Sequence, residues 1–299
     1  MSTYDVYSYG VVSSSTLYST KGVFPDAEGY AEIDGIQYMV GGEAANSSIV
    51  LSRLGARVKL DGNWIGADAG GKRTKAILSD SQIDTSRLPL KEGYVGVQEV
   101  VFAAQATRTI FGTYGRLLDE ASWNAPQEED VLQAKVICLD PFFKDASRRV
   151  AEISHHAGIP AVSVDCLYDD PLLKHLSAVV VSESYIRSEY RDRHVKDLFR
   201  DYQHATSGLV VFTFGDSPIW YARPGENATT FQPYAIDTVD TAGAGDSFRA
   251  GIVYGFLQGW DDRKTIEFAA AVAAMVCERS PGVLSAPSSD EVFDFMRRR

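Results

Sequence analysis

Cysteine is scarce in this chain, with three residues among 299, at positions 138, 166 and 277. The three are far apart, odd in number and set within apolar runs. We therefore expect neither a disulfide framework nor a metal site built from cysteines. We interpret Cys138, Cys166 and Cys277 as buried thiols of a protein in a reducing compartment.

Positive charge and long apolar runs are also lacking. The formal net charge of −11 argues against an electrostatic grip on nucleic acid or on an anionic membrane. The longest apolar candidate for a span, residues 268–277, is about half as long as a bilayer requires. The N-terminus has no basic head followed by an apolar core, as a signal peptide would. We expect a cytoplasmic protein with no nucleic-acid or membrane partner.

Short apolar segments alternate with helix-like segments through most of the sequence. Strands are predicted at residues 136–139, 161–164, 178–181 and 209–214, which is typical of a parallel sheet covered on both faces. Residues 93–111 instead form β-rich runs without a helix between them. We predict one three-layer α/β/α domain over residues 1–299, with a mostly parallel central sheet. A small β-rich lid would come from residues 14–40 and 92–113.

The stretch from Asp240 to Phe248, Asp-Thr-Ala-Gly-Ala-Gly-Asp-Ser-Phe, stands between an extended run and a helical pattern that predicts a helix start near Ala244. Bare amides at a helix start can converge on an anion, aided by the helix dipole. Asp246 adds a carboxylate in the first turn. This combination suits the transfer of a phosphoryl group to a hydroxyl. An ordinary glycine-rich turn with a first-turn acid is the plainer alternative.

A second stretch, Gly41-Gly42-Glu43-Ala44-Ala45-Asn46, also puts bare backbone at a predicted helix start, over residues 44–54. The glycines let a ligand hydroxyl approach the amides, and Asn46 offers a donor and an acceptor. Alone, this stretch supports an ordinary strand-to-helix turn equally well.

Together the two stretches resemble the signatures of the ribokinase-like (PfkB) family of carbohydrate kinases, Gly-Gly-x-x-x-Asn and Asp-Thr-x-Gly-Ala-Gly-Asp. They occur in the family's order and about 200 residues apart. The resemblance runs from about residue 4 to 287 and implies a ribokinase-like fold. It also implies ATP-dependent phosphorylation of a hydroxymethyl group on a small carbohydrate, a sugar or sugar acid, with Mg²⁺ bridging the phosphates. In that mechanism Asp246 accepts the hydroxyl proton, and the amides of Gly243, Ala244 and Gly245 form the anion hole.

The same resemblance implies further binding residues. The acceptor pocket would use Gly41, Gly42 and Asn46, with Ser13 and Ser15 in place of an acid that family members usually carry there. The nucleotide would contact Thr213, Gly215, Thr241, Gly243 and Gly245. Carbonyl groups around Asp237 and Thr238 are candidates for a monovalent cation such as K⁺.

Two positions stand apart from the signatures. Arg108, in a segment similar to one found in some sugar kinases of the family, could neutralise the transferring phosphate. A solvated arginine on a lid strand is an equal alternative. The family's Asn-x-x-Glu, which helps to organise Mg²⁺, aligns with Ser182-Glu183-Ser184-Tyr185, so Glu183 is our candidate Mg²⁺ residue.

Several alternatives stay open. The stretch from Gly66 to Thr74 fits Gly-x-x-x-x-Gly-Lys, but Arg73 stands where a P-loop needs Ser or Thr, so we favour a turn with Lys72 solvated. Within the family, a nucleoside kinase and a degenerate sugar- or nucleotide-binding member without turnover are both alternatives. For the assembly, a homodimer that forms through the lid is one alternative.

Overall fold

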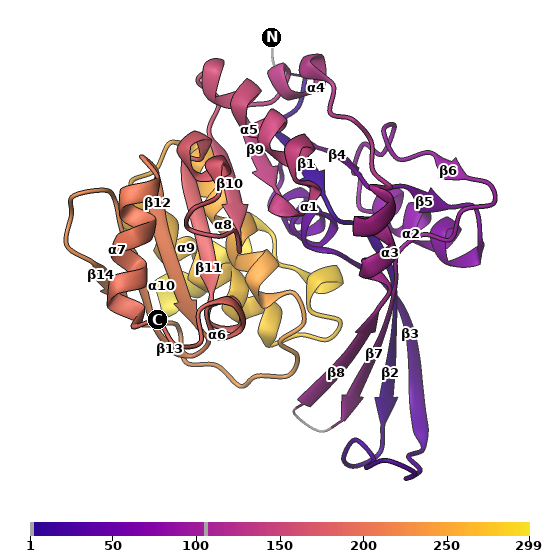
Figure 1. Cartoon of the computed structure of the whole chain (residues 1–299). Helices are drawn as coiled ribbons and strands as arrows, with labels where there is room; N and C mark the ends of the chain where they lie inside the picture. The colour runs from indigo at the N-terminus through magenta and orange to yellow at the C-terminus, as the bar shows by residue number, and fades with distance from the viewer. Residues whose placement is uncertain (1–2, 105–106) are drawn as a thin grey trace.

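The computed structural model describes residues 3–104 and 107–299. Its centre is an eight-stranded sheet with the strand order β14-β13-β12-β11-β10-β9-β1-β4 (Figure 1). Strands β4 to β12 of this order run parallel, and β13 and β14 are antiparallel additions at one edge. The strands are β1 Val6–Gly10, β4 Val58–Gly62, β9 Val136–Leu139, β10 Ala161–Val164, β11 Ala178–Ser182, β12 Leu209–Phe214, β13 Ser217–Ala222 and β14 Thr229–Phe231.

Helices cover both faces of this sheet because successive strand residues point to opposite sides. Val6 and Cys138 belong to one apolar core, whereas their neighbours Tyr7 and Ile137 belong to the other. The first face packs against α1 Glu43–Arg53, α2 Ala69–Asp80, α8 Ala244–Gln258, α9 Asp262–Cys277 and α10 Ser289–Arg298. The second face packs against α3 Tyr114–Glu120, α4 Glu128–Leu132, α5 Asp145–His156, α6 Glu183–Glu189 and α7 Val195–Ala205. The predicted three-layer α/β/α architecture is confirmed.

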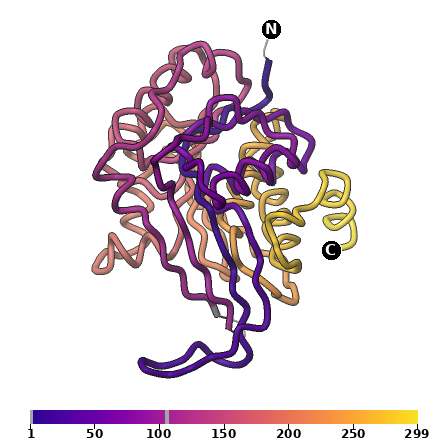
Figure 2. The backbone as a smooth tube through the Cα atoms, turned by 90° about the vertical axis from the view of Figure 1, so that its right-hand side faces the viewer, coloured from indigo at the N-terminus to yellow at the C-terminus, as the bar shows by residue number. Residues whose placement is uncertain are grey.

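A second sheet, in the order β3-β2-β7-β8, projects from this body (Figures 1 and 2). Its strands are β2 Ser13–Thr20, β3 Ile33–Gly41, β7 Gln98–Ala104 and β8 Thr107–Gly112. They come from the two segments predicted to form the lid. Leu17, Met39 and Val101 make a small apolar cluster of their own here. A short parallel pair, β5 Ile65–Gly66 and β6 Leu90–Lys91, lies at the base.

Two local features add to the sequence interpretation. The stretch from Gly66 to Thr74, interpreted as a turn, contains the start of α2 at Ala69, where the Asp68 side chain caps the helix by accepting the Gly71 N–H over 2.8 Å. Strands β4 and β5 are separated by Asn63 and Trp64, and the Asn63 side chain pairs with both the N–H and the C=O of Val12. Where the structure describes the chain, none of its helices combines the length and apolar character needed to cross a membrane.

Candidate active site

A cavity of about 930 Å³ separates the second sheet from the ends of α1, α8 and α9. Its volume is that of a typical small-molecule site. The walls come from strands β2, β3, β7 and β8, from the carboxyl ends of β11 and β12, and from residues 233–248. Open parallel sheets bind ligands beyond the carboxyl ends of their strands, and the cavity lies at that end.

Helix α8 begins at Ala244, as the sequence predicts, and Gly243 precedes it with φ of 72°. Glycine is the residue that adopts this left-handed conformation without strain. The Ala244 N–H donates to Thr241 O over 3.2 Å and so closes the turn. In the described part of the chain, the N–H groups of Gly243, Gly245 and Asp246 have no hydrogen-bond partner. The free amides are therefore not the predicted three, since Asp246 takes the place of Ala244.

The carboxyl group of Asp246 lies at the cavity wall and accepts a hydrogen bond from Asn46 Nδ2 over 2.8 Å. Burial raises the pKa of Asp246 to about 6. Arg249 and the Asn46 hydrogen bond lower that pKa, whereas the charges of Asp140 and Glu99 raise it. The result is a stronger base than an ordinary aspartate that is still mostly ionised at neutral pH. Asn46, predicted as a substrate ligand, holds the predicted base.

A buried ion pair that the sequence did not indicate lies behind Asp246. Arg249 Nη1 and Asp140 Oδ1 are 2.5 Å apart, and both side chains have 0% exposure. Asp140 Oδ2 also accepts the N–H groups of Val11, at 2.7 Å, and Ala44, at 3.1 Å. This network joins the ends of β1 and β9 to helices α1 and α8. The available signal is a basic residue, Arg249, just before the apolar residues 250–257 of the same helix.

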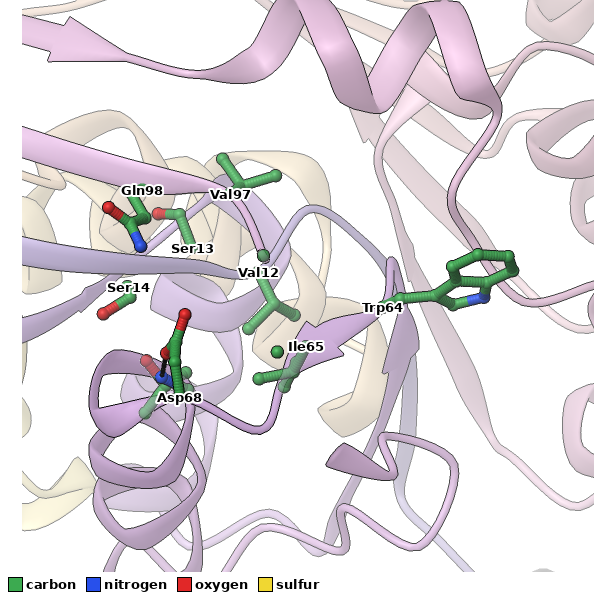
Figure 3. Close-up of a pocket in the computed structure, with 12 residues that line it drawn as sticks. Val12, Ser13, Ser14, Trp64, Ile65, Asp68, Val97 and Gln98 are labelled. Atoms are coloured by element: carbon green, nitrogen blue, oxygen red, sulfur yellow. Dashed lines mark hydrogen bonds between the residues drawn. The ribbon is translucent and has the colours of Figure 1, made fainter. Parts of the chain in front are cut away.

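The predicted acceptor residues are only partly brought together. Ser15, Gly41, Gly42 and Asn46 line the cavity. Ser13 does not: it lines a separate cavity of about 10 Å³ with Ser14, Asp68 and Gln98 (Figure 3). Glu43, Glu99 and Tyr114 line the main cavity instead. Glu43 occupies a variable position of the first signature, so the motif does not mark it, and no local pattern marks Glu99 or Tyr114.

Thr213, Gly215 and Thr241, which we predict to contact a nucleotide, also line the cavity. Ala270, Ala273 and Ala274 of α9 provide an apolar wall beside them. Glu183 lines this part too, and its Oε1 accepts from Arg187 over 2.6 Å. Thr238 lines the cavity, whereas Asp237 does not. Within residues 3–104 and 107–299, no cluster of His, Cys, Asp and Glu has a ready geometry for a metal ion.

Arg108 connects the second sheet to the loop before α8. Its Nη2 donates to Thr241 O over 3.2 Å, and its Nη1 lies 3.8 Å from Asp240 Oδ1. The guanidinium therefore lies against Asp240 and Thr241, in the loop that leads into α8. Lys72, the lysine of the P-loop alternative, is exposed in the first turn of α2 and does not line the cavity.

Comparisons with known proteins show which family this chain resembles. A family model described as "pfkB family carbohydrate kinase" matches residues 16–288. The ATP-dependent ribose-1-phosphate kinase of Halopiger xanaduensis is 27% identical over 297 residues, 92% of each chain. The nucleoside kinase of Methanothermobacter thermautotrophicus is 26% identical over 281 residues, 90% of this chain and 88% of its own.

Solved structures show the same fold. A crystal structure from Agrobacterium tumefaciens superposes with a TM-score of 0.88 at 22% identity, covering 98% of this chain and 97% of its own. Arabidopsis thaliana ribokinase complexed with ribose and ATP gives a TM-score of 0.83 at 18% identity, covering 98% and 99%. The sheet order and the projecting second sheet therefore belong to a known fold.

Proposed function

The chain belongs to the pfkB family of carbohydrate kinases, and from this membership we propose that it transfers the γ-phosphoryl group of ATP to a hydroxymethyl group of a small carbohydrate. One observation carries the proposal. A carboxylate, Asp246, and three amides without a partner in the described chain, those of Gly243, Gly245 and Asp246, belong to residues that line the same cavity. The carboxylate can accept a proton, and the amides can stabilise an oxyanion.

In this mechanism Asn46 holds Oδ2 of Asp246, and Oδ1, which has no partner in the described chain, faces the acceptor. The acceptor hydroxyl gives its proton to Oδ1 while its oxygen attacks the γ-phosphorus. The bond from that phosphorus to the β,γ-bridging oxygen breaks, and ADP leaves. The three amides stabilise the charge on the γ-phosphoryl oxygens. A loose transition state requires little proton transfer until late, so a carboxylate suffices as the base.

Mg²⁺ fits the donor set on the nucleotide side. Hard cations prefer oxygen ligands, and Mg²⁺ in kinases is held by one or two carboxylates together with substrate phosphates. Glu183, Asp165 and Asp216 supply carboxyl groups along this wall. When bound, the ion neutralises phosphate charge. For K⁺, the carbonyl groups around Asp237 and Thr238 stay our candidates, and Thr238 borders the cavity.

We further propose that the second sheet is the lid of a single kinase domain, residues 1–299. A lid that excludes water protects ATP from hydrolysis and strengthens electrostatic interactions. The Arg108 contacts with Thr241 and Asp240 support closure over the phosphates. The sheet also exposes large apolar side chains, which a second copy could cover in a lid-mediated homodimer. They are Ile33, Ile36, Tyr38 and Phe111.

A nucleoside is the second candidate acceptor, because the lid sheet adds an apolar surface to the cavity on which a base could pack. Leu17, Met39, Val101 and Ile110 form this surface. The deciding experiment measures ADP formation from ATP and Mg²⁺ with a panel of sugars, sugar acids and nucleosides. Phosphorus NMR of the product then identifies a primary phosphate ester. If no acceptor yields ADP, the remaining alternative holds, and the chain is a sugar- or nucleotide-binding member of the family without turnover.

A further inference from the structure

The cavity carries an unusual excess of acids. Among the described residues that line it, six are acidic and one, Arg108, is basic. The six acids are Glu43, Glu99, Asp165, Glu183, Asp216 and Asp246. Arg108 is occupied by Thr241 and Asp240 on the phosphate side. Half of the acids, Glu43, Glu99 and Asp246, lie on the acceptor side, where the proposed mechanism places the reacting hydroxyl.

Glu43 carries a buried polar atom without a partner at the border of this region. Its side chain lies at the cavity wall, and its Oε2 is buried without a hydrogen-bond partner in the described chain. Burial, then the charges of Asp140 and Asp246, raise the pKa of Glu43 to about 8. A buried carboxyl group without a partner is costly, so it is expected to be satisfied by a bound molecule. A neutral carboxyl group can both donate to and accept from a hydroxyl.

Glu99 reaches the same region from strand β7 of the lid. Its Oε1 accepts a hydrogen bond from Tyr114 OH. Its Oε2 lies so close to the backbone of Gly41 that a Cβ added there would overlap it. The bare backbone of Gly41, predicted to admit a ligand hydroxyl, thus admits this carboxyl group. The lid consequently contributes a second acid to the acceptor side.

The acceptor side already holds three carboxyl groups, and the pKa values of two of them, Glu43 and Asp246, are raised. Another anion placed there would meet Glu99 and Asp246 at short range in a site of low dielectric. It would also raise the pKa of Asp246 further and so protonate the base that the reaction needs. Arg249, a buried cation behind Asp246, is already paired with Asp140 at 2.5 Å. A neutral polyhydroxy compound meets none of these penalties and supplies donors for the free carboxyl oxygens.

We propose that Glu43 and Glu99 are specificity-determining residues that bind hydroxyl groups of a neutral sugar or polyol and exclude acceptors that carry a carboxylate or a phosphate. The inference rests on the proposed kinase function, because it concerns the acceptor side of the same cavity. It narrows the acceptor from sugars and sugar acids to neutral compounds.

The test compares, for several pentoses and hexoses, the neutral sugar, its aldonic acid and its 1-phosphate, all with a free hydroxymethyl group. The intact enzyme is assayed for ADP formation, and binding of each compound is measured by calorimetry without ATP. We expect kcat/KM for the neutral sugar to exceed that of both anionic partners by about 10- to 1,000-fold. Binding should follow the same order. An acid or phosphate that is bound or phosphorylated as well as its neutral partner overturns the proposal, as does failure of every neutral compound to bind.

Variants locate the source of the selection. Glu43→Gln and Glu99→Gln keep the shapes of the side chains and remove their carboxyl groups, and the glutamine oxygen at 99 can still accept from Tyr114. In the double variant, the ratio of kcat/KM for the neutral sugar to kcat/KM for its acid should shrink by about tenfold or more. The change should come chiefly from a lower KM for the anionic compound. The control is Glu92→Gln, at an exposed residue outside the cavity. It should leave the neutral-to-acid ratio of kcat/KM unchanged. An unchanged ratio in a folded double variant refutes the role of Glu43 and Glu99. If binding favours neutral compounds but no ADP ever forms, the kinase function fails and the charge selection stands.

Discussion

Asn46 and Asp246 stand 200 positions apart and meet through a hydrogen bond of 2.8 Å from Nδ2 to Oδ2. The bond joins the start of α1 to the start of α8, and so connects the two signature stretches. It leaves the Oδ1 atom of Asp246 for the acceptor. The pKa of Asp246 and the position of its Oδ1 atom therefore depend on this pair and on the charges around it.

Asp246→Asn should lower turnover by about 10²- to 10⁴-fold, the usual contribution of a general base. ATP binding should be nearly unchanged, since the substitution keeps the backbone amides that face the cavity. Steady-state kinetics and nucleotide binding measure the two effects separately. Lys72→Ala is the companion variant: a P-loop enzyme would be disabled by it, and this chain should keep its activity. Full turnover by Asp246→Asn would refute the assignment of the base.

The acid limb of the pH–rate profile should have its midpoint near pH 6. Asp246 acts as a base only when ionised, and its pKa is raised to about 6, so kcat/KM should fall as pH drops through that value. The Asn46 hydrogen bond stabilises the ionised form. Asn46→Ala should therefore raise the pKa and move the limb to higher pH. Asn227→Ala, in an exposed loop, should leave the limb in place; a limb that Asn46→Ala does not move would contradict the coupling.

Arg249→Met should destabilise the fold by about 3–5 kcal/mol, because it leaves the Asp140 carboxyl group buried without its cation. Chemical denaturation measures the free energy of unfolding. The matched control is Arg263→Met, which removes an exposed pair with Glu267 and should change stability by less than about 1 kcal/mol. Equal effects of the two variants would show that burial of the Asp140–Arg249 pair has no energetic weight.

Glu43→Gln should stabilise the ligand-free protein at high pH. The folded-state pKa of Glu43 is raised to about 8 from its ordinary value of 4.5, so the folded state binds more protons between these values. Stability contributed by the protonated group is therefore lost as pH rises from about 4.5 to 8. Glutamine cannot ionise, so its advantage should be small at pH 5 and reach about 1–4 kcal/mol at pH 9. Denaturation of both proteins at the two pH values measures it, with Glu92→Gln as the neutral control; an advantage that is independent of pH would contradict the raised pKa.

Much of the framework follows from local patterns. The strands at 136–139, 161–164 and 209–214 and the helix start at Ala244 lie where the sequence predicts them. Each depends on apolar spacing and on glycine or polar punctuation within a few residues, which a single sequence displays directly. The signature stretches carry the same kind of local information, so Asp246 and its glycine-rich loop are predictable from the residues alone.

Partners across the fold could not be found in this way. Nothing near Glu43 or Glu99 in the chain shows that they face one cavity, because their meeting depends on how the lid sheet stands over α1. Ser13 and Ser15 appear equivalent in the sequence, yet only Ser15 reaches the main cavity. The order of strands in the two sheets decides which side chains line the same cavity. It thereby also decides the charge of the acceptor side. Local spacing determined the elements and the reactive loop, whereas long-range packing alone decided which acids surround the base.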